Sequence, residues 1–118
     1  MGYMMMILEP RGQRRTRSPE EGQAAWDSMV ALGADLKARG LLLAGESLRP
    51  DEQATRLQVR SGKSTLIDGP FAEAKEMVGG FFLLDCETKE QALAIARQCP
   101  AAQWATIEIR ETGPCFID

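Results

Sequence analysis

The sequence predicts one α+β domain over residues 1–118, in which a ferredoxin-like split βαβ core carries an inserted β-hairpin. Its length of 118 residues is typical of a single domain, and no linker or repeat divides it. Apolar residues recur with strand and helix periods in the order β-α-β, hairpin, β-α-β. That topology puts the first and third core strands in the middle of the sheet, and these are the two most apolar strands.

The first half of the chain predicts a strand, a helix and a second strand. Tyr3–Leu8 is a continuous apolar run and suits a buried strand. A helix is expected from Pro19 to Arg39, because Ser18 and Glu21 form a capping-box pattern around Pro19. Leu41–Leu48 reads as the second strand. The apolar helix residues at helical spacing are expected to face the core, namely Trp26, Met29, Val30, Gly33 and Leu36.

The second half predicts a hairpin followed by another strand, helix and strand. Thr88 and Gln91 form the capping pattern of the second helix, and Pro100 ends it. The expected strands are Arg56–Arg60 and Ser64–Ile67 for the hairpin, then Met77–Cys86 and Ala105–Arg110.

Composition excludes several classes of function. The chain has 14 basic and 17 acidic residues, so it lacks the basic excess of a nucleic-acid binder. No apolar run approaches the roughly 20 residues that cross a bilayer. Histidine is absent, and the three cysteines form no CxxC pair, so neither a metal site nor a bound cofactor is expected. Unpaired cysteines favour a cytoplasmic location.

Both faces of the central strands are apolar, although helices are expected to cover only one of them. In the first strand, Met4 and Met6 alternate with Tyr3 and Met5. In the later strand, Phe81 and Leu83 alternate with Phe82 and Leu84. An exposed apolar face usually marks an interface. The sequence therefore predicts a homodimer with the two sheets face to face; the alternative is a monomer whose loops and tail cover this face.

Four short motifs together resemble a known family. They are Gly45-Glu46, Asp68-Gly69-Pro70-Phe71, Glu73-Ala74-Lys75-Glu76 and Gly79-Gly80-Phe81-Phe82. Their order and spacing resemble those of the DGPF branch of the YCII-related proteins. The resemblance implies a dimeric α/β barrel, a function that is often unassigned, and, in some relatives, a link to alternative sigma factors. Ala74 replaces a common Ser or Thr, and the His-Asp pair of some wider relatives has no counterpart here.

The Asp68 turn and the charged segment after it are the candidates for catalysis. Asp68, Glu73 and Lys75 could transfer protons if burial shifted their pKa values. The alternative is that Asp68 belongs to a structural turn and that the charged residues are solvated.

Four residues are candidates for ligand binding: Glu46, Phe71, Tyr3 and Gly80. Glu46 interrupts an apolar strand, so it is expected either to contact a ligand or to pair with Lys75 or Arg49. Tyr3 is either a pocket donor or an ordinary packed residue.

Four arginines crowd the loop before the first helix: Arg11, Arg14, Arg15 and Arg17. They either bind an anion or are solvated. The hypothesis that follows is a small dimeric domain that binds a small molecule or regulatory partner in a cavity at the sheet face. The alternatives are a cofactor-independent enzyme of the lyase, isomerase or hydrolase type, and a structural dimer without a pocket.

Overall fold

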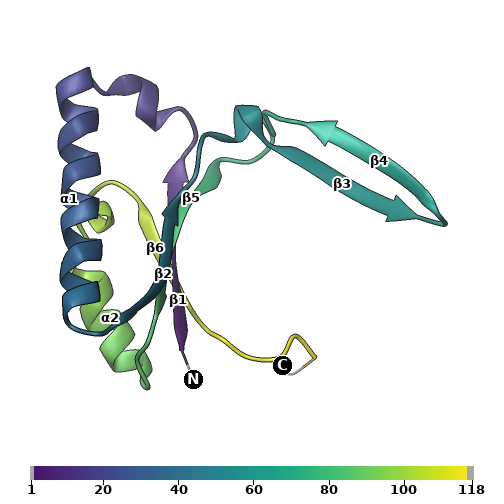
Figure 1. The fold of residues 1–118 in the computed structure, drawn as a ribbon. Coiled ribbons are helices and arrows are strands. Elements are labelled where there is room, and N and C mark those ends of the chain that lie inside the picture. The colour runs from purple at the N-terminus through teal and green to yellow at the C-terminus, as the bar shows by residue number, and fades with distance from the viewer. Residues whose placement is uncertain (1, 117–118) are drawn as a thin grey trace.

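A computed structural model describes residues 2–116 of the chain. Two helices cover one side of a four-stranded sheet, and a two-stranded hairpin projects from the other side (Figure 1). The strands of the main sheet are β1 (Tyr3–Pro10), β2 (Leu42–Ser47), β5 (Glu76–Leu84) and β6 (Thr106–Glu111). The helices are α1 (Pro19–Ala38) and α2 (Lys89–Gln98), the hairpin is β3 (Thr55–Arg60) with β4 (Lys63–Asp68), and short 3₁₀ turns are η1 (Gln13–Thr16), η2 (Asp51–Gln53) and η3 (Pro100–Gln103).

The sheet has the strand order β2-β5-β1-β6, and every neighbouring pair is antiparallel. Strands β1 and β5 therefore occupy the centre, as the apolar character of both segments predicts. This confirms the predicted ferredoxin-like α+β fold with its inserted hairpin. Within residues 2–116, no helix is long and apolar enough to cross a membrane.

Both helices begin at the capping boxes that the sequence predicts. The Ser18 hydroxyl accepts the Glu21 backbone N–H at 3.1 Å, and the Glu21 carboxylate accepts the Ser18 N–H at 2.8 Å. The Ser18 backbone N–H lowers the pKa of the Glu21 carboxyl. Thr88 and Gln91 repeat the arrangement at α2. Each box satisfies donors that a helix start otherwise leaves without partners.

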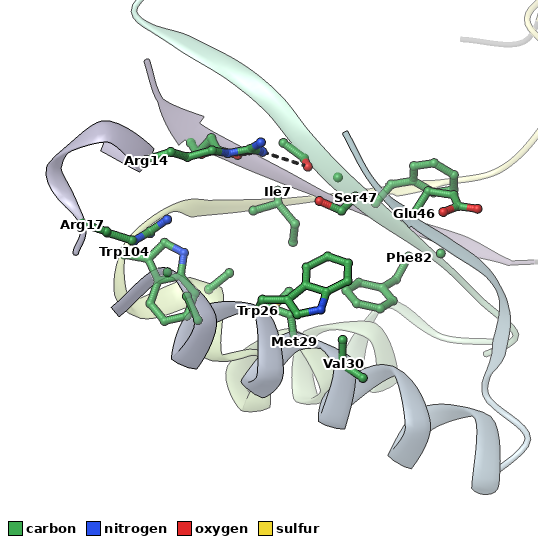
Figure 2. A pocket seen from close by; sticks show the side chains of 18 residues that line it. Ile7, Arg14, Arg17, Trp26, Met29, Val30, Glu46, Ser47, Phe82 and Trp104 are labelled. Atoms are coloured by element: carbon green, nitrogen blue, oxygen red, sulfur yellow. Dashed lines mark hydrogen bonds and ion pairs between the residues drawn. The ribbon is translucent and has the colours of Figure 1, made fainter. Parts of the chain in front are cut away.

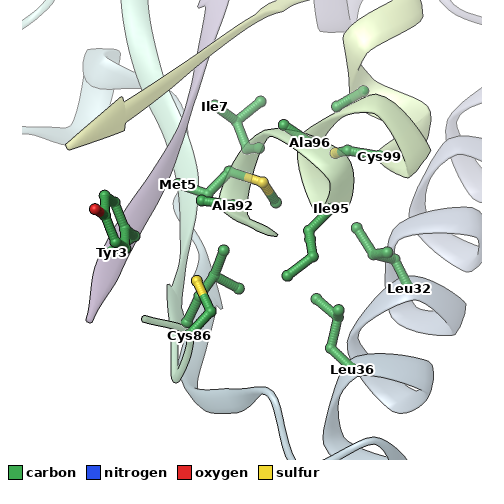
Figure 3. Packing of buried hydrophobic residues seen from close by; sticks show 12 residues of the cluster. Tyr3, Met5, Ile7, Leu32, Leu36, Cys86, Ala92, Ile95, Ala96 and Cys99 are labelled. Carbon is green, nitrogen blue, oxygen red and sulfur yellow. The ribbon is translucent and has the colours of Figure 1, made fainter. Parts of the chain in front are cut away.

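The core lies between the helices and the face of β1 that carries Tyr3, Met5 and Ile7 (Figure 3). Leu36 of α1 is completely buried there. The prediction that Trp26 and Val30 belong to this core is wrong, because their exposed fractions are 53% and 51%. The buried residues of α1 are Leu32 and Leu36 in its C-terminal half. The N-terminal half borders a cleft instead of the core.

The hairpin stands away from the body of the domain (Figure 1). Every residue of β3 and β4 is exposed. Strand register puts Leu57 opposite Leu66 on one face, while Arg56 and Ile67 share the other. An isolated two-stranded ribbon is only marginally stable in water, so this hairpin depends on the contacts at its base.

Candidate functional site

A cleft of about 380 Å³ lies between the N-terminal half of α1 and the central strands (Figure 2). This volume is within the usual range for small-molecule sites. The cleft is on the helix-covered side of the sheet, whereas the sequence directed attention to the Asp68 turn. Its apolar lining includes Ile7, Trp26, Met29, Val30, Phe82 and Trp104.

Trp26 is the most informative residue of the lining. It is more than half exposed, although large aromatic side chains usually bury most of their surface. Its side chain points from α1 across the cleft toward the sheet (Figure 2). Both tryptophans of the chain, Trp26 and Trp104, line this cleft. The arrangement offers apolar and aromatic surface to a ligand.

An ion pair between the buried Glu9 carboxylate and the partly exposed Arg14 guanidinium forms the wall at one end of the cleft. Glu9 is only 6% exposed, and Arg14 binds its carboxylate through Nε at 3.0 Å and Nη2 at 2.5 Å. Arg14 also donates to the backbone oxygens of Leu48 at 2.8 Å and Gly79 at 3.3 Å. The pair therefore joins β1, η1, the end of β2 and β5, and it satisfies a carboxylate that would be costly to bury alone.

Gly79 leaves the space that this pair occupies. A Cβ atom at position 79 would overlap Oε1 of Glu9 and would lie 3.1 Å from Nη2 of Arg14. The glycine is thus required by side-chain packing and not by an unusual backbone angle. This packing explains why the first residue of the Gly79-Gly80 motif is glycine.

Three of the four crowded arginines have carboxylate partners within the chain. Besides Arg14 with Glu9, Arg11 binds Asp51 at 2.8 Å and Arg15 pairs with Glu52. The Arg11 guanidinium lowers the pKa of the Asp51 carboxyl. Arg17 forms no ion pair with any residue that the structure describes. Three arginines of this loop thus form ion pairs that hold the loop to neighbouring segments, and Arg17 is the fourth.

The Asp68 turn forms the base of the hairpin, away from the cleft lining. The Asp68 carboxylate accepts the Thr55 hydroxyl at 2.9 Å, and the Gly69 N–H binds the Ala54 carbonyl at 2.8 Å. The Gly69–Pro70 peptide is cis. A Cβ at Gly69 would overlap the carbonyl oxygen of Asp51, so the turn needs glycine there. In this structure Asp68 closes the hairpin.

Two further predicted site residues lie at the same base. Phe71 is buried, with the Arg56 guanidinium 3.5 Å above its ring centre, a distance typical of a cation–π contact. Glu73 lies 3.6 Å from Arg56. Lys75 is exposed and does not line the cleft. Asp68, Glu73 and Lys75 are thus not gathered in the cleft, and their catalytic role stays a prediction.

The remaining candidates lie in or near the main sheet. Glu46 and Gly80 border the cleft, and their strands approach so closely that a Cβ at Gly80 would lie 2.8 Å from the Glu46 carbonyl oxygen. Glu46 is exposed and pairs with neither Lys75 nor Arg49 among the described residues. Tyr3 is buried in the core and outside the cleft lining, and burial raises the pKa of its phenol.

Comparison with known proteins agrees with the fold. The family model of the YCII-related domain matches residues 1–114. The chain belongs to the YCII-related family. It is also similar to the uncharacterized protein R00369 of Rhizobium meliloti (strain 1021), with 34% identity over 106 residues that cover 90% of this chain and 86% of that protein. The resemblance of the four motifs to YCII-related proteins is thereby confirmed.

The sequence did not indicate that three residues of this YCII-related chain share one cleft: Glu9, Arg14 and Trp26. One signal was available for Glu9, because the two-residue period of β1 puts it on the same face as Tyr3, Met5 and Ile7. A carboxylate on that buried face requires a cation.

Within residues 2–116, no group of three or more Cys, Asp or Glu side chains is placed to hold a metal ion.

Proposed function

We propose that this chain is a dimeric domain that binds a small molecule in the cleft between α1 and the sheet. The observation that carries the proposal is Trp26, a large apolar side chain left 53% exposed at the rim of a cleft of about 380 Å³. Exposed aromatic residues at a concave, mostly apolar surface favour ligand binding. A ligand would cover Trp26 and remove that surface from water.

The proposed dimer interface is the face of the sheet that the helices do not cover. This open face consists of Met4, Met6 and Leu8 of β1 with Phe81 and Leu83 of β5, which strand register puts on one surface. A second copy of the chain with the same face would cover it with matching chemistry. The hairpin projects on this side as well (Figure 1), so it would flank the second copy.

Binding and not catalysis is the function that the described residues support. Asp68, Glu73 and Lys75 are exposed and outside the cleft, whereas proton transfer requires groups within reach of a bound substrate. We also place the chain in the reducing cytoplasm, since Cys86, Cys99 and Cys115 are all unpaired.

The test is a calorimetric titration with 2-naphthol, a neutral and compact apolar probe. We expect saturable binding to the native chain, with affinity falling about tenfold in Trp26→Ala, since truncating a central aromatic contact typically costs at least 1–2 kcal/mol. Leu57→Ala is the matched control, because Leu57 is an apolar residue of the hairpin that is also more than half exposed and lies away from the cleft. Absence of binding, or equal affinity in the two variants, would contradict the proposal.

A further inference from the structure

The charges at one end of the cleft are unequal. Arg14 and Arg17 both line it, together with Glu9. Glu9 compensates Arg14, while Arg17 has no carboxylate partner among the described residues. This end of the cleft therefore combines apolar walls with one cation that has no ion-pair partner, while the Glu46 carboxylate lines the cleft at its other end (Figure 2).

Arg14 has few donors left for a ligand. Its Nε and Nη2 bind Glu9, its Nη1 binds the Leu48 carbonyl and Nη2 also reaches the Gly79 carbonyl. A guanidinium carries five N–H groups in a fixed plane. Four of the five in Arg14 already donate to acceptors within the protein. Arg14 is a fixed part of the wall.

Arg17 is held in place by contacts with neutral groups, and its charge is only partly offset by the Glu21 carboxylate, whose pKa it helps to lower without forming an ion pair. Its guanidinium carbon lies 5.4 Å from the centre of the Trp104 ring, and its Nη2 lies 3.4 Å from the Gln13 amide oxygen. The Gln13 amide nitrogen in turn donates to the Trp104 carbonyl at 2.8 Å. Figure 2 shows Arg17 beside Trp104 at the end of the cleft where Arg14 lies. Among the residues that the structure describes, the Arg17 side chain donates only to Gln13, so most of its N–H groups are left for a ligand at the cleft wall.

We propose that the ligand of this cleft is a compact apolar molecule with a single carboxylate, and that Arg17 binds that carboxylate. This inference rests on the proposed function, since it names the class of ligand for the same cleft. A planar carboxylate matches the fork of a guanidinium, and hydrogen bonds between two charged groups are the strong ones. A doubly charged phosphate is disfavoured, because the single charge of Arg17 would leave one of its two negative charges without a partner in the cleft.

The test compares three probes that share one ring system: 2-naphthoate, 2-naphthamide and 2-naphthyl phosphate. Calorimetry is run at pH 7 on the native chain, Arg17→Gln, Arg17→Lys and the control Arg97→Gln. Arg97 is an exposed arginine of α2 outside the cleft. We expect native protein to bind naphthoate at least about tenfold more tightly than naphthamide, as a charged hydrogen bond allows.

Arg17→Gln should reduce that preference to less than about twofold, Arg17→Lys should keep part of it, and Arg97→Gln should keep all of it. Circular dichroism melts establish that each variant is folded. Equal binding of naphthoate and naphthamide, or a preference unchanged in Arg17→Gln, would overturn the carboxylate inference and leave apolar binding intact. Tighter binding of the phosphate would assign the site to phosphate esters and overturn it too. Failure of all three probes would overturn the proposed function itself.

Discussion

Replacing Arg14 with methionine is expected to lower the free energy of unfolding by about 3 kcal/mol. The substitution leaves Glu9, which is 6% exposed, as a buried carboxylate without a cation. It also removes the donor that satisfies the Leu48 carbonyl. Urea denaturation followed by circular dichroism measures the effect, at one fixed protein concentration because association would add to the apparent stability.

Two control variants separate this effect from a general sensitivity of the loop. Arg15→Met breaks an exposed pair with Glu52 and should cost less than about 1 kcal/mol. The double variant Glu9→Leu/Arg14→Met removes both charges of the pair, including the buried carboxylate, and should recover most of the lost stability. An unpaired buried carboxylate should cost well over about 1 kcal/mol. If Arg14→Met lowers the free energy of unfolding by less than about 1 kcal/mol, Glu9 is not buried in solution as the structure describes.

Replacing Met6 with aspartate is expected to dissociate the proposed dimer. Met6 lies at the centre of the open face, opposite Phe81 on one side and Glu108 on the other. An aspartate would lie there between Phe81 and the like-charged Glu108, and the second copy would remove it from water. The cost of desolvating an unpaired charge predicts a dissociation constant raised by at least about 100-fold.

Sedimentation equilibrium at micromolar concentration measures this effect. Ala31→Asp is the matched control, because it adds the same charge on the exposed surface of α1, outside the core and the cleft. The native chain and Ala31→Asp should be dimers, and Met6→Asp a folded monomer. A native chain that sediments as a monomer, or a Met6→Asp variant that remains dimeric, would contradict the role given to the open face.

The fold was predictable because its signals are local. Capping boxes at Ser18 and Thr88 fix the helix starts, and the two most apolar strands occupy the centre of the sheet. The Asp68-Gly69-Pro70-Phe71 turn was located correctly as the end of a hairpin. What it contacts depends on η2 and β3, which bring Asp51 and Thr55 to it.

The candidate site was less predictable because it depends on contacts between distant segments. Helical spacing alone cannot tell which part of a long apolar stripe meets the core, so Trp26 was predicted to be buried. Charge spacing likewise cannot show that Arg11, Arg14 and Arg15 each meet a carboxylate while Arg17 does not. The sequence emphasised Asp68 as a motif residue. The structure instead directs attention to the cleft beneath Trp26.

Amide chemical shifts recorded during a titration with 2-naphthoate test the central claim, that the cleft binds the ligand, most directly. We expect the largest shifts at residues of α1 from Gly22 to Val30, at Gly79 and Gly80 of β5, and at the indole N–H groups of Trp26 and Trp104. The hairpin amides of β3 and β4 should not move. Shifts that centre on the hairpin or on the open face around Met6, with the two indole signals unchanged, would contradict the account.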